Sequence, residues 1–168
     1  MDLNELKIAG VVEESIVDGK GLRFTIFTQG CPHRCEGCHN PHTHDFSGGE
    51  TVAIHSLLTK IVDNPLLRGV TFSGGEPFCQ AKPLALLAKL VHARKLDVTV
   101  YTGYTLEELD AMHDEAVDEL LAATDVLIDG KFILAERDLR LPFRGSRNQR
   151  IIDMQKTREA GKVILMKE

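Results

Sequence analysis

Apolar residues recur along the chain at two spacings, one typical of strands and one typical of helices. Short apolar runs predict four strands, at residues 22–28, 69–73, 97–102 and 125–129. Apolar residues three and four positions apart predict three helices between them, at residues 51–64, 81–94 and 105–122. Strands that alternate with helices are typical of parallel sheets, so the pattern predicts an α/β fold.

Polar residues indicate where some of these helices begin. Thr105, with Glu108 three residues later, predicts a capping box, and Thr51 is a candidate cap for the first helix. Short strands are predicted at the C-terminal end of the chain, at residues 150–154 and 162–166. The segment 29–50 predicts a loop and 132–149 an irregular arm. We find no linker or repeat, so we expect residues 1–168 to form a single domain.

Residues with chemical character follow the predicted strands. Three cysteines follow the first strand, the turn 74–77 (GGEP) follows the second, and Thr102 ends the third. Asp129 and Lys131 stand at the end of the fourth. Ligands bind at the carboxyl ends of the strands in parallel sheets, so we expect these residues to share one site.

Composition and charge narrow the function classes. The chain is 43% hydrophobic and 27% charged, a mixture typical of globular proteins. Its net charge of -5 disfavours binding to a nucleic-acid backbone. No apolar run approaches the roughly 20 residues of a membrane span, and the N-terminus lacks the pattern of a signal peptide. We therefore expect a cytoplasmic protein with no membrane or nucleic-acid partner.

The cysteines are the strongest chemical signal. Three of the four lie within eight positions, as Cys31, Cys35 and Cys38. Disulfides are rare in a reducing cytosol, and thiolates are the natural ligands of iron–sulfur clusters. Three thiolates leave one iron of a four-iron cluster open to a small molecule. We therefore favour a 4Fe-4S cluster at this loop.

Other interpretations of the loop stay open on spacing alone. A zinc site would need His33 or His39 as its fourth ligand, without the second ligand pair that zinc sites usually have. Cys79 is a candidate fourth iron ligand, although a packing role at a helix start is favoured. The histidines of the loop are expected to face solvent or a partner.

The cysteine spacing Cys-x3-Cys-x2-Cys resembles the motif of the radical S-adenosylmethionine superfamily. Segments similar to its glycyl-radical-enzyme activating proteins are 18–23 (DGKGLR), Phe27, 30–31 (GC) and 38–40 (CHN). Segments similar to the branch that activates anaerobic ribonucleoside-triphosphate reductases are 71–78 (TFSGGEPF), 101–104 (YTGY), 126–132 (VLIDGKF) and 144–149 (RGSRNQ). The resemblance spans about residues 8–154.

The resemblance implies a fold and a set of site residues. The fold would be a partial, open (β/α)6-type barrel. The cluster ligands would be Cys31, Cys35 and Cys38. Residues implied to bind S-adenosylmethionine are Ser73, Gly74, Gly75, Glu76, Thr102, Asp129 and Lys131. Residues that would contact either this cofactor or the partner are Arg144, Asn148 and Gln149.

Two positions depart from the superfamily pattern. Lys20 stands in place of the proline that is common in the Asp-Gly-Pro-Gly stretch, which makes that turn less rigid. Most members carry an aromatic residue just before the third cysteine, where it lies against the adenine, and this chain has Gly37. Glycine at this position is nevertheless similar to the reductase-activating branch.

The resemblance also implies an activity. The chain would be a radical S-adenosylmethionine oxidoreductase that cleaves this cofactor reductively at the cluster. The 5′-deoxyadenosyl radical would abstract hydrogen from a glycine of an anaerobic ribonucleoside-triphosphate reductase. An external donor such as flavodoxin or ferredoxin would supply the electron. The sequence offers no further catalytic constellation, and none is needed for this chemistry.

Two other activities remain as alternatives. The chain could activate another glycyl-radical enzyme, such as a pyruvate formate-lyase, but those activases are usually longer and the 144–149 segment disfavours this. A radical S-adenosylmethionine enzyme that acts on a small molecule would need a substrate pocket of its own, for which we find no residues.

Overall fold

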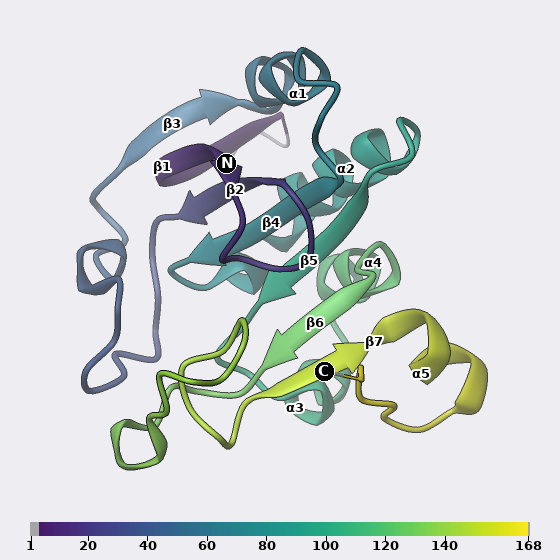
Figure 1. Cartoon of the computed structure of the whole chain (residues 1–168). Coiled ribbons are helices and arrows are strands. Elements are labelled where there is room, and N and C mark those ends of the chain that lie inside the picture. The colour runs from purple at the N-terminus through teal and green to yellow at the C-terminus, as the bar shows by residue number, and fades with distance from the viewer. Residues whose placement is uncertain (1–3, 168) are drawn as a thin grey trace.

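One mixed sheet organises the part of the chain that the computed structural model describes, residues 4–167 (Figure 1). Across these residues it has seven strands in the order β3-β1-β2-β4-β5-β6-β7. The strands are β1 (Glu5–Ser15), β2 (Arg23–Thr28), β3 (Glu50–Ala53), β4 (Gly69–Gly74), β5 (Asp97–Tyr101), β6 (Val126–Asp129) and β7 (Arg150–Asp153). The helices are α1 (Ile54–Val62), α2 (Ala81–His92), α3 (Leu106–Ala111), α4 (Glu115–Ala122) and α5 (Met154–Ala160).

The centre of the sheet matches the pattern of apolar runs. The four predicted strands become β2, β4, β5 and β6, which pair in parallel in that order. The flanking strands β1, β3 and β7 run antiparallel to their neighbours. The α/β class and the open sheet are therefore confirmed, but a (β/α)6 arrangement is not. The parallel part has four strands, because β1 joins β2 as a hairpin and β7 returns from the arm.

Several elements differ from the prediction. Thr51 was expected to cap a helix, but it lies in β3 opposite Lys7, and α1 begins at Ile54. The helix expected at 105–122 is two helices, because His113 adopts a left-handed φ of 49° and Asp114 caps α4. The strand expected at 162–166 is reduced to one isolated bridge at Leu165. β1 and α5 were not predicted from the sequence.

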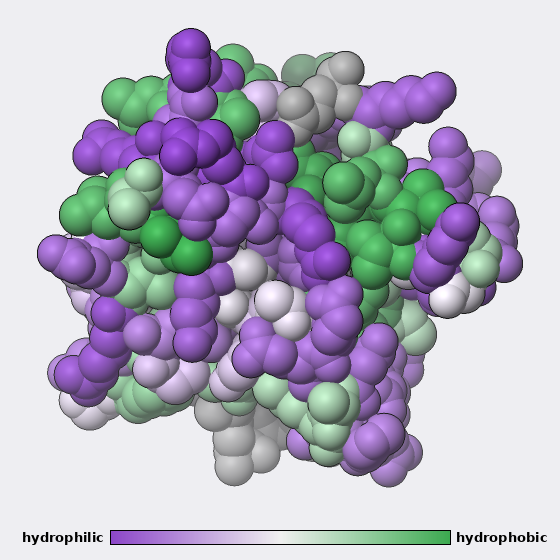
Figure 2. Space-filling model, turned by 90° about the horizontal axis from the view of Figure 1, so that it is seen from below, coloured by the Kyte–Doolittle hydropathy of each residue, from purple (hydrophilic) through white to green (hydrophobic). Residues whose placement is uncertain are grey.

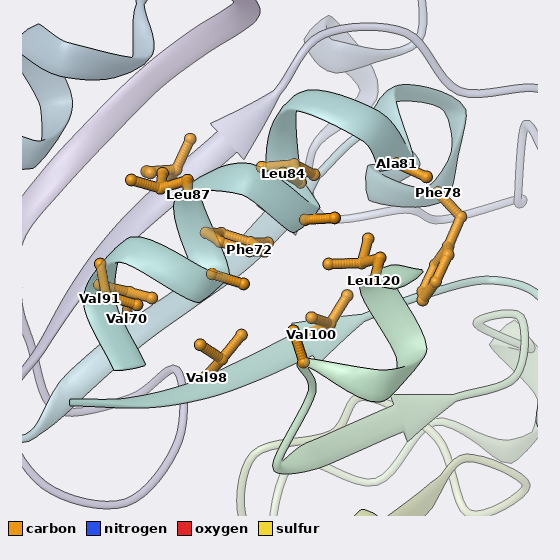
Figure 3. Packing of buried hydrophobic residues seen from close by; sticks show 14 of the residues in the cluster. Val70, Phe72, Phe78, Ala81, Leu84, Leu87, Val91, Val98, Val100 and Leu120 are labelled. Atoms are coloured by element: carbon orange, nitrogen blue, oxygen red, sulfur yellow. The ribbon is translucent and has the colours of Figure 1, made fainter. Parts of the chain in front are cut away.

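Much of the hydrophobic core lies between the sheet and the helices α2 and α4 (Figure 3), and α1 adds Ile54, Leu57 and Ile61 to it. Alternate residues of β4 and β5 point toward these helices, and full burial of each such side chain stabilises the fold by about 1.5–3 kcal/mol. The buried side chains labelled in Figure 3 include Val70, Phe72, Val98 and Val100 from the strands and Leu84, Leu87, Val91 and Leu120 from the helices.

The opposite face of the central strands is polar. Thr25, Thr71 and Thr99 stand side by side in register on β2, β4 and β5, and all three are buried. Figure 1 shows that the β1–β2 loop and the arm 131–149, rather than α2 and α4, cover this face. The Thr71 hydroxyl donates to the carbonyl oxygen of Asp18 in that loop at 2.7 Å. Loops therefore enclose the polar face, and the site described below lies at its edge.

The surface seen from below is mainly hydrophilic (Figure 2). Its largest hydrophobic area lies on the side of the molecule where Figure 1 places α5. None of the helices described for residues 4–167 has the length and apolar character that a membrane crossing requires.

Candidate functional site

A cavity of about 600 Å³ opens at the carboxyl ends of the parallel strands. Its walls come from the β1–β2 loop, the cysteine loop, the turns after β4, β5 and β6, and the arm. The volume is typical of cofactor sites. Of the predicted site residues, those that line it are Cys31, Cys35, Cys38, Ser73, Gly74, Gly75, Thr102, Arg144 and Gln149. The sequence analysis therefore identified residues from four separate segments that meet here.

Backbone hydrogen bonds fold the cysteine loop onto the end of β2. The Gly30 amide donates to the Thr43 carbonyl at 2.6 Å, and the Cys31 amide donates to the His44 carbonyl at 3.1 Å. The Glu76 amide donates to the Gly30 carbonyl at 2.8 Å, which joins the loop to the turn after β4. These contacts hold the first cysteine beside the strand ends.

The three loop thiols are free and share the cavity. Burial raises the pKa of the Cys31 and Cys35 thiols, while backbone amides beside them act in the opposite direction. The Asn40 amide donates to the Cys38 sulfur at 3.4 Å. Lys131 lies close enough to Cys35 to act in the same direction as these amides, but burial outweighs them, so the pKa of the Cys35 thiol is raised overall.

The donor set fits an iron–sulfur cluster. Within residues 4–167, no three His, Cys, Asp or Glu side chains converge closely enough to hold a single metal ion. Each thiolate ligand of a four-iron cluster binds a different iron, so cluster ligation does not require that convergence. Cys79 lies outside the cavity lining, in the short helix η2 (Pro77–Gln80), and burial raises the pKa of its thiol to about 11.

Glu76 is the buried centre of a hydrogen-bond network. Its side chain accepts from His33 Nε2 at 2.6 Å, from the Thr102 hydroxyl at 2.9 Å and from the Gly103 amide at 2.8 Å. The Phe78 amide donates to its second oxygen at 3.0 Å. The network joins the cysteine loop to the turns after β4 and β5. Internal partners thus occupy both carboxylate oxygens.

The environment of His33 in the cysteine loop differs from the one expected from the sequence. This histidine was expected to face solvent or a partner, but its ring is buried against Glu76 and meets Tyr104 edge-on, with ring centroids 4.5 Å apart. Thr102 lines the cavity, yet its hydroxyl donates to Glu76. The local signal for burial was weak, because the carboxylate partner lies 43 residues further along the chain.

Asp129 also has internal partners. Its buried carboxylate accepts from Arg150 Nε at 3.0 Å and from the Leu106 amide at 2.8 Å. It therefore fixes the start of α3 and the pairing of β6 with β7. Neither Asp129 nor Glu76 is among the residues that line the cavity, and the same holds for Lys131 and Asn148.

The arm is fastened to the end of β6 by its polar side chains. Asn148 Nδ2 donates to the Lys131 carbonyl at 2.8 Å, and Gln149 Nε2 donates to the Gly130 carbonyl at 3.0 Å. Arg144 Nη1 donates to the Gln149 carbonyl at 2.7 Å. The structure therefore gives Asn148 and Gln149 a clear role in shaping the arm, and it brings Arg144 to the cavity wall.

Gly37 is required by its surroundings. Its φ is +74°, and an added Cβ would lie 2.9 Å from Leu134 Cδ1 and 3.3 Å from Phe132 Cε1. The arm therefore occupies the space beside the third cysteine. Phe132 lines the cavity and meets His39 edge-on at a centroid distance of 5.4 Å. Phe132 ends the segment 126–132 quoted for the resemblance, but no site role was assigned to it because its side chain carries no ligating or charged group.

Other lining residues were also missed. They include Ile16, Val17, Tyr101, Leu139, Leu141, Pro142 and Phe143. Most are apolar residues of loops, for which the sequence carries no periodic signal. Only the placement of the β1–β2 loop and the arm over one face of the sheet brings them to the cavity.

An open α/β sheet with three thiols at its strand ends defines an iron–sulfur cluster protein. In agreement, residues 17–152 match the family described as 4Fe-4S single cluster domain. The chain belongs to the anaerobic ribonucleoside-triphosphate reductase-activating proteins. It is 37% identical to that protein of Haemophilus influenzae over 142 residues, which cover 80% of this chain and 89% of the relative.

Further relatives carry the same name. The protein of Vibrio cholerae is 39% identical over 143 residues, which cover 80% of this chain and 89% of the relative. The protein of Enterobacteria phage T4 is 32% identical over 143 residues, which cover 80% of this chain and 86% of the relative. Among solved structures, QueE from Escherichia coli is similar with a TM-score of 0.47 and 21% identity, over 60% of this chain and 54% of QueE.

Proposed function

We propose that this chain activates an anaerobic ribonucleoside-triphosphate reductase by reductive cleavage of S-adenosylmethionine. Cys31, Cys35 and Cys38 would hold the 4Fe-4S cluster. The observation that carries the proposal is the shared cavity, in which the three thiols face the glycine turn after β4. The names of the relatives support the reductase as the target.

The three cysteines would hold a cluster that supplies the single electron needed to break the sulfur–C5′ bond of S-adenosylmethionine, with methionine and a 5′-deoxyadenosyl radical as the products. The hydrogen taken up by that radical would come from a glycine of the reductase. The chain's own residues bind, orient and enclose the cofactor. Gly74 has a φ of +90° and an added Cβ would lie 2.5 Å from the Thr28 amide nitrogen, so only glycine fits there. We propose that Ser73, Gly74 and Gly75 present backbone groups to the methionine part of the cofactor.

The charged residues divide into two roles. Lys131 lies near Cys35 and would pair with the methionine carboxylate. Glu76 and Asp129, whose oxygens already have internal donors, would position the strand-end turns instead of binding the cofactor directly. Thr102 would contribute its backbone or methyl group to the wall, since its hydroxyl donates to Glu76.

Further parts of the proposal concern the setting. We regard the open sheet as a partial counterpart of the (β/α)6-type radical S-adenosylmethionine barrel, carried by a single domain. An open side would leave room for a segment of the reductase. The electron would come from an external donor such as a flavodoxin or a ferredoxin. We propose that the protein acts in the cytoplasm, without a nucleic-acid or membrane partner.

Anaerobic reconstitution tests this function. We expect the parent protein to bind about four irons per chain, to form 5′-deoxyadenosine from S-adenosylmethionine with reductant, and to produce a glycyl radical in the reductase. Cys35→Ala should abolish all three, whereas Cys79→Ala, outside the cavity, should retain them. A radical signal that persists in Cys35→Ala would refute the proposal. Activation of a pyruvate formate-lyase, but not of the reductase, would overturn the choice of target.

A further inference from the structure

The mouth of the cavity carries unusually exposed apolar side chains. Ile16, Val17 and Leu139 are 73%, 70% and 77% exposed, and all three line the cavity. Of the large apolar residues between positions 4 and 167, only Leu66, at 74%, is comparably exposed. Three of the four therefore gather at one opening. Exposed apolar groups that cluster, instead of being scattered singly, mark interaction sites.

Two segments supply these residues. Ile16 and Val17 belong to the β1–β2 loop, and Leu139 belongs to the arm. Figure 1 shows both segments on the face of the sheet that α2 and α4 leave uncovered. The three cysteines line the cavity as well, so the apolar rim and the thiols border the same cavity.

The arm holds its tip in place. The Asp138 amide donates to the Gly145 carbonyl at 3.2 Å, and the Arg147 amide donates to the Glu136 carbonyl at 2.9 Å. The Tyr101 hydroxyl donates to the Phe143 carbonyl at 2.6 Å, which ties the arm to the end of β5. Leu139 therefore projects from a hydrogen-bonded frame. A preformed surface loses less conformational entropy on binding than a mobile one.

The charge of the arm differs from that of the whole chain. Residues 131–149 contain five Lys or Arg and two Asp or Glu, whereas the chain has a net charge of -5. Arg137 and Arg147 are exposed on the arm. The arm thus carries exposed positive side chains on either side of Leu139, while Asp18 and Asp138 are the acidic residues among those that line the cavity. A segment that complements the rim and the arm has apolar side chains and acidic neighbours.

We propose that Ile16, Val17 and Leu139 form the docking surface for the glycine-bearing segment of the reductase. This inference rests on the proposed function and adds the site of contact. The reacting glycine lacks a side chain, so its backbone reaches into the cavity while the flanking apolar side chains stay on the rim. The acidic neighbours of that segment lie against Arg137 and Arg147.

Binding of the reductase to the reconstituted protein tests the docking surface directly. The variant carries Ile16→Ser and Leu139→Ser together, and calorimetry measures its affinity for the full-length reductase. We expect the dissociation constant to rise at least about tenfold, as loss of central apolar contacts does at other interfaces. Iron content after anaerobic reconstitution should stay at the parent level, because neither residue is a proposed cluster ligand. Leu66→Ser, equally exposed but outside the rim, should change neither quantity.

Each outcome separates the docking surface from the proposed function. If the double variant binds the reductase as tightly as the parent does, or if Leu66→Ser loses as much affinity as the double variant, the docking surface is wrong. Neither result bears on the proposed cleavage of S-adenosylmethionine. A parent that cleaves no S-adenosylmethionine refutes the proposed function, while the binding measurement still decides the surface. A rim that instead mediates self-association, lost in the double variant without loss of reductase affinity, also overturns the inference.

The proposed contact of acidic residues with Arg137 and Arg147 is tested separately. Arg137→Gln with Arg147→Gln should slow association with the reductase several-fold at low salt and have little effect at high salt. If the variant associates as fast as the parent at low salt, the reductase segment has no acidic residues against Arg137 and Arg147.

Discussion

Two charge networks lie at opposite ends of the same parallel strands and connect different parts of the molecule. At the carboxyl ends, Glu76 joins the cysteine loop, through His33, to the turns after β4 and β5. At the amino ends, Arg23 of β2 pairs with Asp97 of β5 at 2.5 Å and donates to the Thr71 hydroxyl at 2.7 Å. One network positions the candidate site, and the other fastens the strands together.

The two networks also differ in burial. The side chains of His33 and Glu76 are 5% and 0% exposed, whereas Asp97, the partner of the buried Arg23, is 35% exposed. When Arg23 is lost, Asp97 keeps Arg68 as a partner at its outer oxygen, although the oxygen that faces Arg23 is buried. In the part of the chain that the structure describes, the donors around Glu76 have no such exposed alternative. The comparison implies that stability depends on both networks, while the geometry of the cysteine loop depends on one.

Replacement of Glu76 should have the largest effect. Glu76→Ala leaves several buried donors without an acceptor, so we expect a loss of about 3–5 kcal/mol in the free energy of unfolding. Chemical denaturation of the cluster-free protein measures this. We also expect fewer irons per chain after reconstitution, because His33 loses its anchor.

The milder Glu76→Gln keeps one acceptor oxygen and provides a variant that folds. If Glu76→Gln is destabilised yet binds iron like the parent, Glu76 does not position the cysteine loop and the comparison fails.

Arg23→Met tests the other end of the strands. It retains the apolar stem but removes the guanidinium that donates to Thr71 and to the Val70 carbonyl. We expect a loss of about 2 kcal/mol in the free energy of unfolding, since Asp97 keeps its ion pair with the exposed Arg68. Iron content should match that of the parent. Iron loss as large as in the Glu76 variants would show that the two networks are not separable.

The sequence predicted the centre of the sheet because local signals suffice there. β2, β4, β5 and β6 are short apolar runs bounded by turns, and the capping box at Thr105 is confirmed. β1 was missed because its burial is irregular and its C-terminal half is mostly exposed. The break after α3 did have a signal, since Asp114 is followed by the first turn of α4 and caps it. That helix was read as continuous because its apolar period hardly changes.

The site was predictable where glycines and cysteines carry the chemistry, and not where contacts join distant segments. The three cysteines and the turn at Gly74 line one cavity, as the convergence of strand ends predicted. The burial of His33 depends on Glu76, and the placement of Leu139 depends on how the arm folds back onto β6. Neither leaves a periodic or local pattern. The roles of Asn148 and Gln149 in shaping the arm likewise depend on hydrogen bonds to Gly130 and Lys131.

Contact between the arm and the cysteine loop can be separated from backbone strain. Gly37 and Gly161 have similar left-handed φ values of 74° and 69°. An added Cβ at Gly37 would lie 2.9 Å from Leu134, whereas at Gly161 it would meet nothing within 4 Å. We expect Gly161→Ala to cost about 1 kcal/mol from strain alone, and Gly37→Ala about 2 kcal/mol. If thermal or chemical denaturation shows equal losses of stability for the two variants, Leu134 moves away from the added Cβ at no cost in free energy.

The smallest expected effect concerns a solvent-exposed partner of a buried ion pair. Arg150 binds the buried Asp129 and also Glu107, whose side chain is 61% exposed. The hydrogen bond from Arg150 lowers the pKa of Glu107 below its ordinary value of 4.5. A carboxyl with a lowered pKa in the folded state stabilises the fold above its unfolded pKa. The contribution is lost as the pH falls through the folded value.

We therefore expect Glu107→Gln to reduce the free energy of unfolding by only about 0.3–0.5 kcal/mol at pH 7, since solvent screens exposed pairs. The difference from the parent should shrink as the pH falls below 4.5. Denaturation curves at several pH values measure it, with Glu14→Gln on the exposed part of β1 as control. A difference that is independent of pH would show that Glu107 acts through packing instead of charge. A loss as large as that of Asp129→Asn would mean that exposure does not weaken the pair, which would contradict the role assigned to burial at both ends of the strands.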